Sequence, residues 1–317
     1  MSGSHYKNAA KSARRPSRGD RALVIMVVVA MVVGVALIAY PIVSNWFSRI
    51  EREKVEQTHE QAIEKTPEED LSAYKAAAEQ YNQDLLAGKT VVTDPFDPNT
   101  LSSDSSERYW QVLNLAGDGL MGTLVIPKLG VSLPIYHGTD EDVLQKGVGH
   151  MATTSVPIGG PSTHAVLAGH TGLPAMVVFD RLETLSEGDY FVIRVLGEDH
   201  AYKVSGTEVV LPTETDSLAI QDGRDLVTLV TCTPYGVNDH RFLVHAERCE
   251  VPAEYYENNH GVSPAEAVVS AAADPVTTFS FIGALIALVG TAFAVAQLVR
   301  LRRGRHKRAG KPNRPKR

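Results

Sequence analysis

The sequence predicts a mainly β domain, folded as a closed or nearly closed barrel, that lies between two apolar segments near the ends of the chain. Three observations support this prediction. Residues 119–250 consist of short runs rich in β-branched and aromatic residues, separated by Gly and Pro. Uncharged apolar runs occupy residues 22–43 and 276–299. Residues 49–88, rich in Glu, Lys, Gln and Ala, have a composition typical of helices.

The two apolar runs predict transmembrane helices. As a helix, the 22 residues of the first run reach roughly 33 Å, enough to cross a hydrocarbon core of about 30 Å. The second run keeps its polar residues near its ends, where they cost least. A buried core helix is the alternative for each run, but their length and lack of charge argue against it. The first run also resembles a signal peptide, although no convincing small-residue cleavage site follows it, which favours an uncleaved anchor.

The charges beside these runs predict their orientation. Residues 1–21 carry six Lys and Arg against one acid, and residues 300–317 carry ten against none. Positive flanks stay in the cytoplasm, so we expect both basic tails inside the cell and residues 44–275 outside. The outer segment has 36 acidic and 15 basic residues, a net charge of about −21. This charge argues against nucleic acid as a partner.

The outer segment divides into four parts. Residues 44–88 form a membrane-proximal segment with apolar residues at roughly helical spacing, which predicts one or two amphipathic helices; a solvated charged spacer is the alternative. Residues 89–105 contain two Asp-Pro pairs and a Ser/Asp cluster, so they predict a loop. Residues 106–250 form the barrel, and residues 251–275 a polar, Ala-rich linker to the second apolar run.

Within the barrel, alternating apolar residues between turn signals predict the strands. Short helical turns are expected at residues 140–147 and 176–182. The predicted strands lie in GTLVIPKL, VSLPIYH, THAVLAGH, DYFVIRVL, HAYKVSGTEVVL, DLVTLVTC and HRFLVHAE.

The two cysteines, Cys232 and Cys249, first suggest a disulfide, as is usual outside the cell. If the strands on either side of residues 233–240 form an antiparallel hairpin, Arg241 faces the Cys232 end. Cys249 then lies eight residues further along, or about 25 Å away. A disulfide needs Cα atoms within about 7 Å, so Cys232 is predicted to be a free thiol at a strand end, where catalytic groups often lie.

A thiol becomes a nucleophile at neutral pH when a neighbouring cation favours the thiolate. His170 ends an apolar strand and has small neighbours, so it is a candidate acid or base; a purely structural histidine is the alternative. Arg241 is expected to face the thiol, where its guanidinium would hold a developing oxyanion. An ordinary surface ion pair is the alternative for Arg241.

The motifs around these residues resemble those of the sortase family. Residues 228–232, TLVTC, followed by TPYGVNDHR, look like its active-site signature, and LAGHTG at residues 167–172 looks like its histidine motif. Residues 122–139 and 147–160 are similar to the first barrel strands of the class C branch, which builds pili. The resemblance covers roughly residues 109–248, and the motifs fall in the order of the family.

This resemblance implies an eight-stranded sortase-type barrel and assigns a role to each candidate. Cys232 would be the nucleophile, His170 the acid/base, and Arg241 the stabiliser of the oxyanion or substrate. Thr231 would belong to the substrate pocket. Thr171 stands where the branch often has Arg, which alters the rim of the pocket without removing a catalytic group.

The resemblance also implies a lid, formed by Asp94-Pro95-Phe96. Asp94 would pair with Arg241, and the Phe96 ring would cap Cys232. The alternative is that Asp94 and Phe96 only shape a turn.

The function implied by the resemblance is that of a membrane-anchored cysteine transpeptidase. It would cleave an LPXTG-like sorting signal and join pilin subunits by lysine isopeptide bonds, with pilin subunits and the membrane as its partners. No cofactor or metal is expected, since no acidic calcium-binding cluster is evident. The alternatives are a sortase that anchors proteins to peptidoglycan, against which the lid and the second apolar run argue, and a non-catalytic pilin-binding scaffold. The sequence predicts neither the sorting signal, the acceptor lysine nor the oligomeric state.

Overall fold

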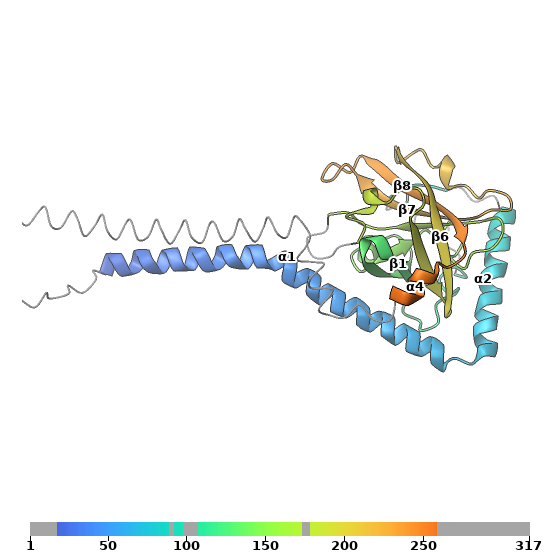
Figure 1. Cartoon of the computed structure of the whole chain (residues 1–317), viewed down its shortest axis with the longest axis horizontal. Helices are drawn as coiled ribbons and strands as arrows, with labels where there is room; N and C mark the ends of the chain where they lie inside the picture. The colour runs from blue at the N-terminus through green and yellow to red at the C-terminus, as the bar shows by residue number, and fades with distance from the viewer. Residues whose placement is uncertain (1–17, 89–91, 98–106, 173–177, 259–317) are drawn as a thin grey trace, which may run out of the picture. The chain divides into compact units, whose positions relative to one another are not determined.

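A computed structural model describes residues 18–88, 92–97, 107–172 and 178–258 (Figure 1). The chain divides into two compact units, one of residues 1–42 and 264–317 and the other of residues 43–263. The second unit contains a closed barrel, which confirms the predicted mainly β barrel domain.

The barrel has eight strands in the order β1-β2-β3-β4-β7-β8-β6-β5. The pairs β2–β3 and β4–β7 are parallel, and the other neighbours are antiparallel. Every strand except the short β3, in a Gly-rich stretch, was predicted from sequence. The strands are β1 (Leu120–Ile126), β2 (Val131–His137), β3 (Val148–His150), β4 (Thr163–Ala168), β5 (Tyr190–Val195), β6 (Glu198–Val210), β7 (Asp225–Thr233) and β8 (His240–Cys249).

Alternation along the strands gives two apolar layers. Leu229 on β7 and Val244 on β8 belong to the main core inside the barrel. Their neighbours Val230 and Leu243 point the other way, because successive side chains of a strand face opposite sides of the sheet. They form a second group, here called the lid-side cluster, which consists of Met151, Val166, Leu218, Val230 and Leu243.

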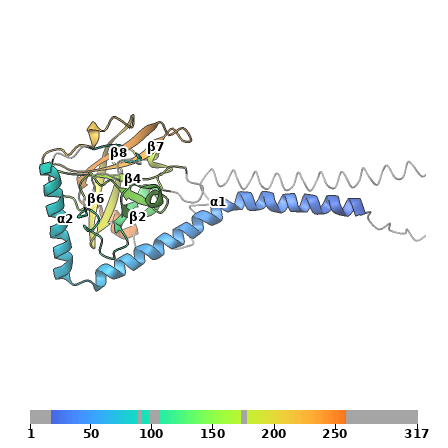
Figure 2. The same ribbon diagram turned by 180° about the vertical axis from the view of Figure 1, so that it is seen from behind.

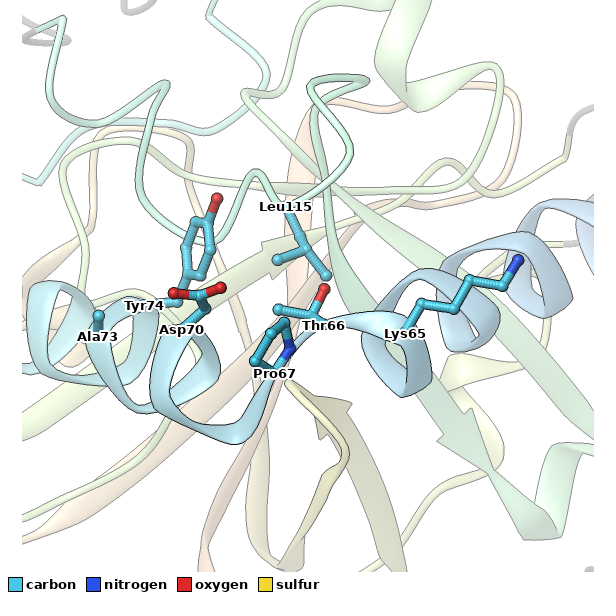
Figure 3. Close-up of a pocket in the computed structure, with 7 residues that line it drawn as sticks. All are labelled: Lys65, Thr66, Pro67, Asp70, Ala73, Tyr74 and Leu115. Atoms are coloured by element: carbon cyan, nitrogen blue, oxygen red, sulfur yellow. The ribbon is translucent and has the colours of Figure 1, made fainter.

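Residues 44–88, predicted to be helical, lie in α1 (Arg18–Lys65) and α2 (Glu68–Gly88). Figure 2 shows α2 running beside the barrel, and its contacts explain why. Asn82 on α2 is buried and exchanges two hydrogen bonds with the backbone of Val156: its Nδ2 donates to the carbonyl at 3.1 Å, and its Oδ1 accepts from the amide at 2.8 Å. At the turn between α1 and α2, Thr66, Asp70 and Leu115 help to line a surface pocket (Figure 3).

None of the helices in the described ranges is both long enough and apolar enough to cross a membrane. The span predicted at residues 22–43 falls within α1 and stays a prediction. The second predicted span, residues 276–299, and the basic tail of residues 300–317 lie outside the described residues, as do residues 1–17 of the first tail.

Short helices lie in or beside three connecting segments for which the sequence predicted turns or a linker. The turn expected at residues 140–147 contains α3 (Glu141–Leu144). The turn expected at residues 176–182 is partly outside the described residues, and a 3-10 helix, η2 (Leu182–Thr184), begins at its end. The predicted linker begins with a helix, α4 (Ala253–Asn258), because the ring of Tyr255 is buried against β5 and β6.

Candidate active site

Cys232 lies at the end of β7, directly across from Arg241 on β8. This is the pairing that the hairpin argument predicts. Residues 226–231 of β7 are buried, whereas Cys232 is half-buried, so the thiol emerges where the strand leaves the core. Cys249 pairs with Ala201 at the far end of β8, and both cysteines are free.

His170 follows β4, which runs parallel to β7. Ala168 on β4 pairs with Val230 on β7, and His170 and Cys232 each come two residues later. Parallel neighbours in register point equivalent residues to the same side of the sheet, so His170 and Cys232 emerge from the same edge of the barrel.

Thr231 is buried between the two strands, with 3% of its surface exposed. Its hydroxyl donates a hydrogen bond of 2.7 Å to the carbonyl of Gly169. This hydrogen bond ties Thr231, which precedes Cys232, to Gly169, which precedes His170. A contact between Thr231 and substrate stays a prediction.

The loop after β4 is closed around His170 by Asp180. The Asp180 carboxylate accepts hydrogen bonds from the amides of Gly172, at 2.9 Å, and Val178, at 3.1 Å. The carbonyl of His170 accepts a third from the amide of Phe179, at 3.0 Å. Gly169 is required here, because a Cβ at that position would lie 2.7 Å from the Phe179 ring. Thr171, expected at the pocket rim, is half-buried in this loop.

Glu141 on α3 is a neighbour of His170 that sequence reasoning missed. Its Oε2 lies 3.3 Å from His170 Nε2. The two residues are 29 positions apart in different elements, so no local spacing reveals the contact. Asp180 was missed as well, although an acid that closes a Gly-containing loop is a common turn device.

Asp94 binds one edge of the Arg241 guanidinium through both of its carboxylate oxygens. Nε of Arg241 donates to Oδ1 at 2.9 Å, and its Nη2 donates to Oδ2 at 2.6 Å. Nη1 donates to the carbonyls of Asn238 and His240, both at 3.1 Å. The Arg241 and Asp94 side chains are only 11% and 12% exposed. This bidentate, largely buried pair is the strongest type of charged contact between side chains.

Phe96 lies over the same site. Its ring centroid is 5.0 Å from Arg241 Cζ, a cation–π distance, and 6.1 Å from the centroid of the His170 ring. The ring also packs on the lid-side cluster. Asp94 accepts a hydrogen bond of 3.3 Å from the Phe96 amide, so these residues shape a turn and reach the site at the same time. Direct contact of Phe96 with Cys232 stays a prediction.

The surroundings of Cys232 disfavour the reactive form of the thiol. Burial raises the pKa of Cys232; the positive charge of Arg241 opposes this shift, and the negative charge of Asp94 adds to it. Burial alone would lower the pKa of Arg241, but the hydrogen bonds to Asp94, together with the charges of Cys232 and Asp94, outweigh burial and raise it. Arg241 therefore stays charged while Cys232 is held as the neutral thiol.

The arrangement brings together the groups that acyl transfer needs. A thiol, an imidazole and a guanidinium emerge from the ends of β7, β4 and β8, which are neighbours in the barrel. In the described part of the chain, no group of three or more His, Cys, Asp or Glu side chains is placed to hold a metal ion.

Comparisons with known proteins agree on one family. Residues 124–249 match the family model described as a sortase domain. The crystal structure of sortase C-1 from Actinomyces oris is 47% identical, covering 57% of this chain and 99% of that one, with a TM-score of 0.53. Sortase C1 from Streptococcus agalactiae is 36% identical, covering 63% and 100%, with a TM-score of 0.58. Sortase D of Bacillus subtilis is 32% identical over 40% of this chain, and the match spans 63% of that protein, less than two thirds.

Proposed function

The chain belongs to the class C branch of the sortase family and is a cysteine transpeptidase, and from this premise we propose that it joins pilin subunits into a fibre. The observation that carries the proposal is the pairing of Cys232 with Arg241 across β7 and β8, beneath a lid in which Asp94 binds that arginine. Sortase C of Streptococcus pneumoniae, whose solved structure resembles the chain and is described in terms of pilin substrate specificity, supports pilin subunits as the substrate class.

In the proposed first step, the Cys232 thiolate attacks the carbonyl carbon of the Thr–Gly bond in an LPXTG-like sorting signal. Arg241 stabilises the negative charge on the carbonyl oxygen of the tetrahedral intermediate. His170 gives a proton to the departing glycine amine, and a thioester to Cys232 remains.

In the second step, a lysine amine of another pilin subunit attacks the thioester carbon. His170 takes up the proton that this amine loses, and Cys232 leaves as the thiolate. The product is an isopeptide bond between two subunits, and the enzyme returns to its starting state. Thr231, one residue before the nucleophile, is proposed to shape the pocket by fixing the end of β7 against the loop that carries His170.

The proposed mechanism requires the lid to open. Nε and Nη2 of Arg241 both donate to Asp94, so they reach an oxyanion only after Asp94 has left. The Phe96 ring lies against Arg241 and His170, where a substrate backbone would have to pass. We therefore propose that the lid is closed at rest and that substrate access limits turnover.

The proposed location is the outer face of the cell membrane, with both chain ends in the cytoplasm. This part of the proposal rests on the apolar runs at residues 22–43 and 276–299 and on the basic residues beside them. Anchoring at the membrane suits an enzyme whose substrates are themselves held there before assembly.

The test uses the full-length chain in detergent, with Phe96→Ala to open the lid, and compares it with the same protein carrying Cys232→Ala. Cleavage of a sorting-signal peptide and polymerisation of a cognate pilin are both measured. We expect activity only when Cys232 is present, and activity that survives its loss would overturn the proposal. Transfer to a peptidoglycan-type amine but not to a pilin lysine would instead favour wall anchoring.

A further inference from the structure

The short helix α3 places a carboxylate beside the His170 ring. Glu141 Oε2 lies 3.3 Å from His170 Nε2, at the long end of hydrogen-bond range. The other oxygen, Oε1, accepts a hydrogen bond of 2.8 Å from Nε2 of Gln145, one helical turn later. Both carboxylate oxygens of Glu141 are therefore engaged, and one of them is directed at the imidazole.

The helix that carries Glu141 is fixed to the barrel. Asp140 caps it by accepting a hydrogen bond of 3.1 Å from the amide of Val143. Leu144 is 2% exposed, and its Cδ2 lies so close to β3 that a Cβ at Gly149 would be 3.1 Å away. Glu141 thus lies on an element that is packed against the barrel, and such support is what a side chain needs in order to orient another.

The ionic form of Glu141 determines which ring nitrogen of His170 carries the hydrogen. The hydrogen bond from Gln145 and the contact with His170 lower the pKa of Glu141, so it is a carboxylate at neutral pH. A carboxylate can only accept hydrogen bonds, so Nε2 of His170 must carry the hydrogen. Nδ1 is then the ring nitrogen left for the reacting groups.

We propose that Glu141 is a positioning residue for His170: it selects the Nε2–H tautomer and holds the ring so that Nδ1 faces the reaction. This inference rests on the proposed function of the site. When the thiol is activated, the Sγ proton moves to Nδ1 and leaves a thiolate and an imidazolium. The same Nδ1 proton passes to the departing glycine amine, and the attacking lysine amine later restores it.

The Phe96 ring explains why a second constraint on the imidazole is needed. With the lid closed, the ring of Phe96 lies 6.1 Å from that of His170 and limits its movement. When the lid opens, this contact is lost, whereas Glu141 belongs to α3 and stays in place. Glu141 therefore keeps the imidazole oriented in the open state, in which chemistry takes place.

The kinetic test compares Glu141→Ala and Glu141→Gln with Asp142→Ala, all in the full-length chain with Phe96→Ala. Asp142 is the matched control, because it is an exposed acid in the same first turn of α3. We expect Glu141→Ala to lower kcat by about tenfold to a hundredfold with little change in KM. The kcat of Glu141→Gln should lie between those of Glu141→Ala and the unsubstituted residue, since the amide oxygen of Gln still accepts a hydrogen bond. Equal kcat for Glu141→Ala and Asp142→Ala would overturn the inference.

A spectroscopic test separates this inference from the proposed function. Nitrogen-15 NMR of labelled histidine, recorded at about pH 8.5 where imidazole is normally neutral, reports which ring nitrogen carries the hydrogen. Full-length chain with Phe96→Ala and Cys232→Ala should show His170 as the Nε2–H tautomer, and adding Glu141→Ala should give a mixture. An unchanged tautomer in that variant would overturn the inference. If the full-length chain with Phe96→Ala shows no turnover, that result counts against the proposed function alone. The NMR spectra then decide whether Glu141 positions His170.

Discussion

At the scale of single residues, Asp94 acts on two groups at once. It binds the guanidinium of Arg241, and its negative charge adds to the burial that raises the pKa of Cys232. Removal of the Asp94 carboxylate therefore changes the surroundings of both the proposed stabiliser, Arg241, and the proposed nucleophile, Cys232. In the proposed mechanism, the lid therefore regulates the charge around Cys232 as well as access to it.

The first prediction concerns Asp94→Ala. The variant loses a negative charge near Cys232 and exposes the thiol, and both changes favour the thiolate, so the pKa of Cys232 should fall. The midpoint of iodoacetamide alkylation against pH should move to lower pH, and the rate at neutral pH should rise on the order of tenfold. The measurement uses a Cys249→Ser background, so that Cys232 alone is labelled.

Asp239→Ala is the control for this prediction. Asp239 is an exposed acid in the loop before Arg241, and it contacts His240 rather than the guanidinium. Its loss should leave the midpoint where it is. If the midpoint of Asp94→Ala also fails to move, the lid carboxylate does not control the thiol.

At the scale of elements, the lid is held by the segment between β6 and β7 as well as by Arg241. The hydroxyl of Thr215 donates a hydrogen bond of 3.0 Å to the carbonyl of Val92, at the start of the described lid residues. The 3-10 helix η3 (Asp216–Leu218) adds Leu218 to the lid-side cluster, against which Val92 and Phe96 pack. Two separate elements therefore keep the lid closed.

The second prediction tests this contact with Thr215→Val, which keeps the shape of the side chain and removes the hydroxyl. Loss of one hydrogen bond costs about 1 kcal/mol, so the open population should rise about fivefold. Alkylation of Cys232 at fixed pH should accelerate by the same factor. Thr213→Val, at an exposed position of the same segment, should leave the rate unchanged. Equal rates for the two variants would mean that η3 does not restrain the lid.

The elements also show how far the sequence could predict the site. The position of Arg241 across from Cys232 followed from alternation and a short loop, which together fix the register of a hairpin. The parallel pairing of β4 with β7 did not follow, because it joins strands with two others between them in the chain. The contacts of Glu141 with His170 and of Thr215 with Val92 join residues 29 and 123 positions apart, so no local pattern reveals them either.

At the scale of the whole molecule, buried histidines make stability depend on pH. Burial lowers the pKa of His150 to about 3 and that of His164 and His200 to about 4. His164 is fully partnered as a neutral ring, with Nδ1 against the carbonyl of Ala219 and Nε2 against the hydroxyl of Thr228. Protonation of such a ring removes the acceptor at Nε2, so the hydroxyl of Thr228 can no longer donate to it, and leaves a buried charge.

The third prediction follows from the sign of these shifts. Each folded-state pKa lies below the unfolded value of about 6.5, so the unfolded chain binds more protons as the pH falls. The free energy of unfolding should be steady above about pH 6.5 and fall by several kcal/mol towards pH 4. Urea unfolding of the full-length chain, followed by near-ultraviolet circular dichroism at a series of pH values, measures this.

Two variants test whether the buried histidines cause the pH dependence of the free energy of unfolding. His164→Gln should give a shallower fall in stability, because one buried titrating group is gone. His240→Gln removes an imidazole that is 40% exposed and should leave the slope of the wild type. A free energy of unfolding that is the same at pH 7 and pH 4.5 would contradict the prediction.

The parallel pairing of β4 and β7 has a consequence for how such an enzyme can diversify. His170 and Cys232 are 62 positions apart in the sequence, yet their relation is set by the register of two adjacent strands. The intervening chain can therefore gain or lose residues in its loops without displacing the thiol and the imidazole. That interval includes η3 and Thr215, which meet the lid. Under the proposed mechanism, changes in this interval can thus alter substrate access and substrate choice without altering the groups that react.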